Sequence, residues 1–138
     1  MIVQPYAMFQ GKCDEAIEFY KKALDAHSVT VMRFKDNPDP PPGGTPPEMQ
    51  DKVMHAEMKI GETTIMLSDG MCTGKLGVVN MVLTISVADD AEAQKRFKAL
   101  SEGGEIRQPL IKTFFATSFG MLTDKFGVGW MILARAKP

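Results

Sequence analysis

The feature that most constrains the fold is an order of elements that occurs twice. A strand-like alternation, a helical pattern and three more strands follow one another in each half. The first set covers residues 3–9, 14–24, 28–34, 53–60 and 63–68. The second set covers residues 80–87, a helix between Asp89 and Gly103, and residues 105–110, 115–123 and 128–134. The chain of 138 residues is therefore predicted to form one domain, residues 1–138, from two βαβββ repeats at 1–70 and 78–138.

The two helical segments support this repeat. The apolar residues of the first fall on one stripe, namely Ala16, Ile17, Tyr20, Ala23 and Leu24. Shifted by 76 positions, Asp14 matches Asp90 and Leu24 matches Leu100. Asp89, followed three residues later by Glu92, is typical of a helix N-terminus.

Residues 36–50 interrupt the first repeat with a proline-rich segment. Six of the nine prolines and a Gly-Gly pair lie there, and neither a helix nor a central strand tolerates such a sequence. We expect an exposed loop, which is either a tolerated surface insertion or a lid over a pocket.

Composition excludes several classes of function. A formal net charge of −1 argues against a nucleic-acid surface, and no apolar run approaches the length of a membrane helix. The N-terminus lacks a signal-peptide pattern, so a cytoplasmic location is expected. Cys13 and Cys72 form no disulfide framework and are expected to be free thiols, Cys13 either packed beneath a turn or reactive at a helix start.

The strand at residues 53–60 has two unlike faces. Met54, Ala56, Met58 and Ile60 form its better core face. His55 and Glu57 lie on the opposite face, where they make a candidate base and orienting carboxylate. Alternatively, His55 only makes a hydrogen bond at a sheet edge or a subunit interface.

Several local strings resemble a known family. They are Pro5-Tyr6, Gly11 to Ala16, Glu18-Phe19-Tyr20, Asp51 to Glu57, Ser68-Asp69, Leu100 to Gly104, Phe119 to Val128 and Trp130-Met131. Together they resemble the PhnB-like branch of the glyoxalase, bleomycin-resistance and extradiol-dioxygenase superfamily, the vicinal-oxygen-chelate proteins. The resemblance implies an α+β fold in which two βαβββ repeats form a curved mixed sheet around a cup. It also implies a homodimer.

Metal-binding members of this superfamily place four ligands on the first and fourth strands of each repeat. By the resemblance, those positions carry Pro5, Met66, Val82 and Met131. None offers a side-chain oxygen or nitrogen to a divalent ion. We therefore expect no metal and no cofactor, and not the metal-dependent chemistry of glyoxalases, epimerases or dioxygenases.

The expected cup is apolar with a few polar groups, which is the profile of a small-molecule site. The candidate pocket residues are Phe9, His55, Glu57, Met66, Ser68, Val82, Thr84, Ser86, Phe115 and Met131. Three hypotheses follow. The first is a metal-independent protein that binds a small, partly apolar molecule, and the second is an enzyme that uses His55 and Glu57 for proton transfer. The third is a methyltransferase, because a demethylubiquinone methyltransferase label accompanies this family, although no glycine-rich cofactor turn is present.

Overall fold

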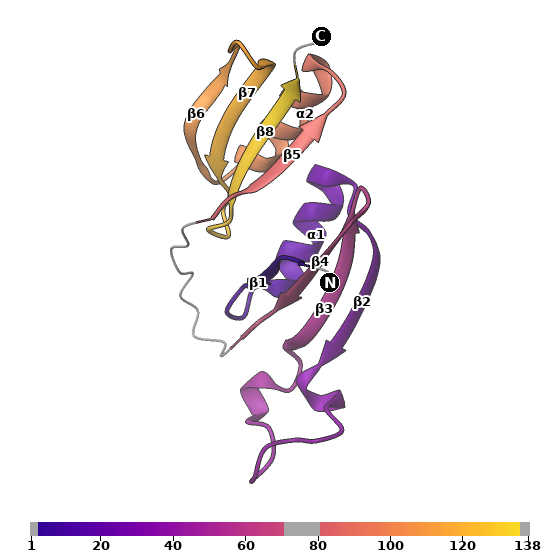
Figure 1. The fold of residues 1–138 in the computed structure, drawn as a ribbon. Coiled ribbons are helices and arrows are strands. Elements are labelled where there is room, and N and C mark those ends of the chain that lie inside the picture. The colour runs from indigo at the N-terminus through magenta and orange to yellow at the C-terminus, as the bar shows by residue number, and fades with distance from the viewer. Residues whose placement is uncertain (1–2, 71–80, 136–138) are drawn as a thin grey trace. The chain divides into compact units, whose positions relative to one another are not determined.

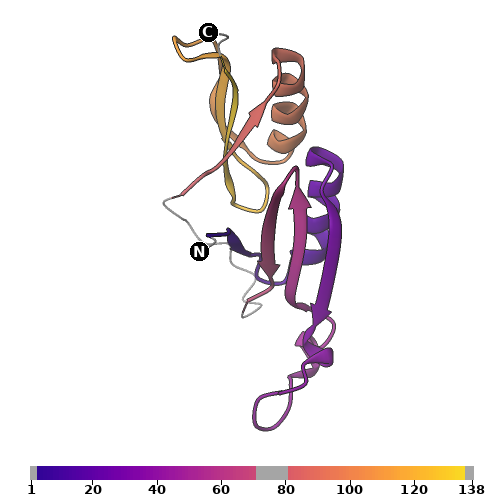
Figure 2. The same ribbon diagram turned by 45° about the vertical axis from the view of Figure 1, so that its right-hand side comes forward.

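A computed structural model describes residues 3–70 and 81–135 and divides the chain into two compact units, Met1–Leu76 and Gly77–Pro138. Each unit contains one helix and one four-stranded mixed sheet, which gives the predicted α+β, βαβββ architecture. The helix of each unit covers one face of that unit's sheet (Figures 1 and 2). We call the opposite face the open face of the unit.

The first unit consists of β1 (Tyr6–Met8), α1 (Cys13–Leu24), β2 (His27–Arg33), β3 (Val53–Ile60) and β4 (Thr63–Ser68). Its sheet has the order β1-β4-β3-β2, in which β1 is parallel to β4 and the other pairs are antiparallel. Helix α1 packs the predicted stripe toward the sheet, because Ala16, Ile17, Tyr20, Ala23 and Leu24 are all buried. Ala56 and Met58 of β3 are buried with them, as the alternation of that strand predicts.

The proline-rich segment departs from the expectation in one detail. Residues 36–50 contain no buried residue, which agrees with an exposed loop. Short 3-10 helices nevertheless form at Phe34–Asp36 (η1) and Pro47–Met49 (η2). The expectation that no helix forms there was wrong for η2, because Pro47 stands at the first turn, where a helix needs no backbone N–H.

The second unit consists of β5 (Leu83–Val87), α2 (Asp90–Ser101), β6 (Glu105–Ile111), β7 (Ala116–Thr123) and β8 (Gly129–Arg135). Its order, β5-β8-β7-β6, has the same form as that of the first unit, with β5 parallel to β8. Asp89 caps α2 by accepting a hydrogen bond from the Glu92 N–H at 2.9 Å, as predicted. Gly120 allows α2 to approach the sheet, because a Cβ there would lie 2.7 Å from the Phe97 ring.

Two strands are shorter than the sequence predicts. Strand β1 covers three residues rather than 3–9, and β5 begins at Leu83 rather than at position 80, which lies outside the described residues. Gln10 has a φ of 51°, so the chain leaves the extended conformation before α1 begins.

Candidate functional site

The open face of the first unit brings together three polar side chains. Tyr6 of β1 lies beside Met66 of β4, and Met66 in turn lies beside Glu57 of β3. His55 is two residues from Glu57 on the same strand and therefore points to the same face. Three strands thus contribute one continuous row of side chains.

Direct contacts join these three groups. The Tyr6 hydroxyl lies 2.8 Å from His55 Nδ1, within hydrogen-bond distance. His55 Nε2 lies 3.8 Å from Glu57 Oε2, close enough for an ion pair when the imidazole is protonated. The Tyr6 and His55 rings meet edge to face, with centroids 5.5 Å apart. We call Tyr6, His55 and Glu57 the polar chain.

Apolar side chains surround the polar chain. Met66 lies between Tyr6 and Glu57 in the register, and Met32 of β2 lies beside His55. Met8 of β1 shares the face with Tyr6, and both Met8 and Met32 are exposed. Thioethers are polarisable and adapt to aromatic or alkyl surfaces, so this face offers one hydrogen-bonding row within an apolar surface.

The structure corrects one assignment made for the first repeat, that of Phe9. Phe9 is only 1% exposed, and its ring packs against Tyr20 of α1, so it belongs to the helix-side core and not to the open face. The expectation was wrong because β1 ends at Met8. Ser68 is 5% exposed, and its hydroxyl accepts a hydrogen bond from the Gly70 N–H.

Tyr6 is the functional candidate that sequence reasoning missed. The resemblance places both Pro5 and Met66 at ligand positions, which would turn Tyr6 to the opposite face. In the structure Tyr6, not Pro5, is the register partner of Met66, while the Pro5 carbonyl accepts the Met66 N–H. A one-residue change of register exchanges the faces of a strand, and three residues of β1 contain too little alternation to fix it.

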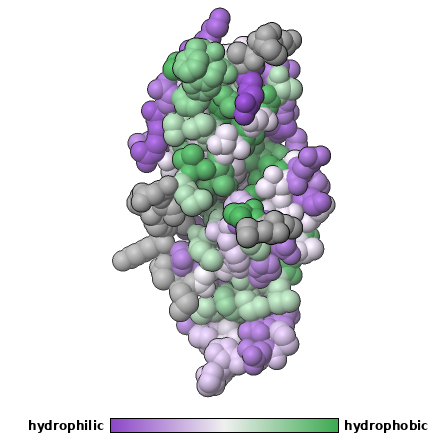
Figure 3. Space-filling view, viewed as in Figure 1, coloured by the Kyte–Doolittle hydropathy of each residue, from purple (hydrophilic) through white to green (hydrophobic). Residues whose placement is uncertain are grey.

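The open face of the second unit has a different character. Thr84 and Ser86 of β5 are exposed, and the Thr84 hydroxyl lies 3.9 Å from the Met131 sulfur. Phe115 contacts Phe119 edge to face at 5.5 Å, and Phe114, which is 96% exposed, contacts Phe115. Hydrophobic side chains gather over these strands in Figure 3. Val82, another predicted pocket residue, precedes β5 and is partly exposed.

The side chains at the four positions that the resemblance assigns to metal ligands do not fit a divalent ion. Pro5, Met66, Val82 and Met131 supply only carbon and thioether sulfur at the inferred positions. Within residues 3–70 and 81–135, no group of three or more His, Cys, Asp or Glu side chains is arranged to hold an ion. The polar chain contributes one imidazole and one carboxylate.

Cys13 packs inside the first unit rather than facing a site. Burial, with Asp69 and Asp14 nearby, raises the pKa of its thiol to about 12. Such a thiol stays protonated and unreactive at neutral pH. This supports the packing interpretation over a reactive thiol. Cys72 lies outside the described residues.

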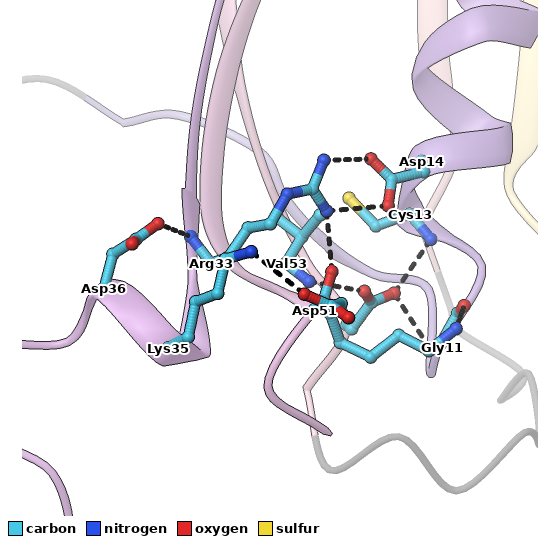
Figure 4. A network of polar contacts seen from close by, with 10 residues as sticks. Gly11, Cys13, Asp14, Arg33, Lys35, Asp36, Asp51 and Val53 are labelled. Atoms are coloured by element: carbon cyan, nitrogen blue, oxygen red, sulfur yellow. Dashed lines mark hydrogen bonds and ion pairs between the residues drawn. The ribbon is translucent and has the colours of Figure 1, made fainter. Parts of the chain in front are cut away.

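The buried Asp69 carboxylate accepts hydrogen bonds from three backbone N–H groups, those of Gly11, Cys13 and Val53, which Figure 4 labels. Its Oδ1 accepts hydrogen bonds from the backbone N–H groups of Gly11 and Cys13, and its Oδ2 accepts one from Val53. The carboxylate therefore joins the start of α1 and the start of β3 to the end of β4.

Ion pairs hold the two ends of the proline-rich loop (Figure 4). Arg33 makes two hydrogen bonds to the Asp14 carboxylate, at 2.9 and 3.0 Å, and one to the Asp51 carbonyl at 2.7 Å. Asp14 raises the pKa of the Arg33 guanidinium, and Lys35, 3.0 Å from Asp51, lowers the pKa of that carboxyl. We call Asp14, Arg33, Lys35 and Asp51 the loop clasp.

No helix among the described residues is both long and apolar enough to cross a membrane. This agrees with the absence of an apolar run of that length in the sequence.

Comparison with known proteins assigns the family. The family model described as 3-demethylubiquinone-9 3-methyltransferase matches residues 2–133. Protein YjdN of Escherichia coli (strain K12) is 33% identical over 138 residues, covering 96% of this chain and 94% of YjdN. The crystal structure of protein PA1353 from Pseudomonas aeruginosa is 34% identical, with a TM-score of 0.83 and 99% of both chains covered.

A Bacillus cereus structure described as a putative 3-demethylubiquinone-9 3-methyltransferase, PhnB protein, is 26% identical, with a TM-score of 0.78. It covers 97% of this chain and 99% of its own. The sequence motifs, the βαβββ repeats and these matches agree with one another. The chain therefore belongs to the PhnB-like family that carries the 3-demethylubiquinone-9 3-methyltransferase description.

Proposed function

We propose that the protein binds a small, partly apolar organic molecule without a metal ion, on the open face where Tyr6, His55 and Glu57 meet. The observation that carries the proposal is the polar chain, with its 2.8 Å contact between Tyr6 and His55, set among the methionines of the same face. Small-ligand sites characteristically combine apolar walls with a few placed polar groups. The side chains of the polar chain are partly exposed and therefore accessible.

Proton transfer is the second candidate function, and the Tyr6–His55 contact favours it specifically. A substrate proton would pass to the Tyr6 oxygen while the Tyr6 proton passes to His55 Nδ1. Glu57 would then stabilise the imidazolium through the 3.8 Å contact. This is the arrangement of a reacting group, a base and an orienting carboxylate.

A methyltransferase activity, which the family description names, has less support. Gln10, Gly11 and Lys12 follow Phe9 between β1 and α1 and supply a single glycine. Rossmann-type cofactor sites use several glycines at this turn, so that the backbone approaches the cofactor.

Native mass spectrometry of gently purified protein tests the binding proposal. We expect the protein to retain an organic mass that denaturation releases. The variant His55→Gln should retain less of it, while His27→Gln, which changes the only other histidine, should retain as much as the original protein. Equal retention by both variants would place the ligand elsewhere, and a protein that never carries or takes up an organic ligand would overturn the proposal.

We also propose a homodimer, on the basis of the family resemblance. Light scattering should give twice the mass of one chain. A concentration-independent mass of a single chain would contradict this proposal and leave the ligand proposal standing.

A further inference from the structure

We infer that the open face of the first unit selects molecules that carry a hydroxyl group beside an apolar part. The ligand hydroxyl donates a hydrogen bond, and the Tyr6 oxygen accepts it. This inference rests on the proposed binding function and names the class of ligand. It follows from which atoms of Tyr6 and His55 carry a hydrogen and which do not.

Glu57 fixes the first step. Its Oε2 lies 3.8 Å from His55 Nε2. A neutral imidazole carries one N–H, on either nitrogen, and a bare ring nitrogen facing a carboxylate would bring two lone pairs together. The carboxylate therefore favours the tautomer with hydrogen on Nε2.

The second step follows from the first. With hydrogen on Nε2, Nδ1 is an acceptor, so in the 2.8 Å contact the Tyr6 hydroxyl donates to His55. The hydroxyl group of a phenol has only one hydrogen to donate. Among the described residues His55 is the hydrogen-bond partner of this hydroxyl, so the partly exposed Tyr6 offers a ligand only the lone pairs of its oxygen.

The third step concerns the ligand. Tyr6 is 43% exposed, and its register partner Met66 and its neighbour Met8 are apolar. A ligand hydroxyl finds an acceptor in the Tyr6 oxygen, and the apolar part of the ligand contacts the thioethers. A carboxylate or phosphate would meet lone pairs instead, beside the negative charge of Glu57, and is disfavoured.

Two matched probes test the inference. 4-Methylphenol carries the hydroxyl hydrogen, and 4-methylanisole replaces it with a methyl group. With methionine methyls labelled with carbon-13, both should shift the signals of Met8 and Met66. We expect 4-methylphenol to bind about fivefold more tightly, the effect of one neutral hydrogen bond. Tyr6→Phe should abolish that preference and leave the affinity for 4-methylanisole unchanged. 4-Methylbenzoate should bind more weakly than either.

The outcomes separate this inference from the proposed function. If both probes bind this face equally in the original protein, or if Tyr6→Phe retains the preference, the inference is overturned while the binding function stands. If neither probe moves the Met8 or Met66 signals, the proposed site itself is overturned.

A measurement on the unmodified protein needs no ligand. Long-range proton–nitrogen NMR spectra at mildly alkaline pH should show His55 with its hydrogen on Nε2, and Glu57→Gln should reduce that preference. His27 supplies an internal reference within the same spectrum. Hydrogen on Nδ1 of His55 would contradict the inference, because Tyr6 would then present a donor.

Discussion

The two open faces are built on the same strand order but differ in chemistry. The first carries a phenol, an imidazole and a carboxylate in one row, with contacts of 2.8 and 3.8 Å. The centre of the second carries hydroxyls, thioethers and phenyl rings, and its Arg107–Glu105 ion pair lies at the β6 end of the sheet. The repeated backbone therefore sets where side chains point, while the residues in the row set what each face can do.

The units also differ in how buried carboxylates stabilise them. Asp69 accepts hydrogen bonds from residues 16 to 58 positions away. Asp124 accepts from Phe126, Val128 and the Trp130 indole, all within six positions. The first carboxylate joins separate elements, and these three hydrogen bonds of the second lie within one hairpin.

The largest expected effect tests this difference. Asp69→Ala should lower the free energy of unfolding by about 3 to 5 kcal/mol, because three backbone donors lose a charged acceptor. Asp124→Ala should cost about 2 to 3 kcal/mol, because two backbone donors and the Trp130 indole lose their acceptor. Urea unfolding measures both, with Asp39→Ala in the exposed loop as the control. A loss for Asp69→Ala no larger than that for Asp39→Ala would contradict the role of Asp69 in joining separate elements.

High pH should weaken the first unit through Cys13. Its thiol has a pKa of about 12 in the folded chain, against 9.0 for the free group. Between these values the unfolded state binds fewer protons, so stability falls as pH rises, by up to roughly 2 kcal/mol at pH ~10.5. Cys13→Ala should remove this part of the pH dependence, and Cys72→Ala should leave it. Unfolding curves at several pH values give the comparison, and identical slopes for both variants would contradict it.

A carboxylate placed on one open face at a time tests which of the two faces binds the ligand. Met66→Glu sets a second negative charge opposite Glu57 and should lower the affinity for 4-methylphenol by about 1.5 to 2 kcal/mol. Met131→Glu places the same charge on the open face of the second unit and should leave that affinity unchanged, because the proposed site lies on the first unit. Titration followed by NMR measures both. A loss confined to Met66→Glu would support the site on the first unit, and an affinity that survives Met66→Glu would contradict it.

His55→Gln should have a smaller effect on a binding protein. The change removes the Tyr6–His55 hydrogen bond that leaves the Tyr6 oxygen as an acceptor, and it should weaken 4-methylphenol binding by about 0.5 to 1.5 kcal/mol, the range of one neutral hydrogen bond. In an enzyme, the same change should abolish turnover with little change in apparent affinity. Affinity and turnover measured on one preparation separate the two, and His27→Gln controls for loss of any imidazole.

The smallest expected effect is that of chelation. Elemental analysis should find no stoichiometric Zn, Ni, Fe or Mn, and a chelator should leave the melting temperature unchanged, because a bound metal would stabilise the native state by mass action. Thermal unfolding with and without the chelator is the measurement. A lowered melting temperature would show that one of the faces holds an ion.

The sequence predicts well where helices and strands occur. It predicts less well which face of the sheet each residue of a short strand occupies. The eight residues of β3 alternate clearly, and His55 and Glu57 were placed correctly opposite Ala56 and Met58. Three-residue β1 has no such pattern, and its register depends on parallel pairing with β4, some sixty positions away. Tyr6 was missed for this reason, because its role depends on a strand distant in sequence.

The loop clasp has a practical consequence. Lys35 and Asp51 join the ends of the loop, and the backbone bond from the Lys35 N–H to the Gln50 carbonyl reinforces the closure. The ends therefore stay together whatever lies between them. Lengthening a closed loop is thermodynamically cheap, about 0.6 kcal/mol for each doubling. Gly43 and Gly44, both at positive φ with open space around them, mark a site where a reporter peptide or a small domain can be grafted. Such a graft would provide a fluorescent handle without changing any residue of β1, β3 or β4.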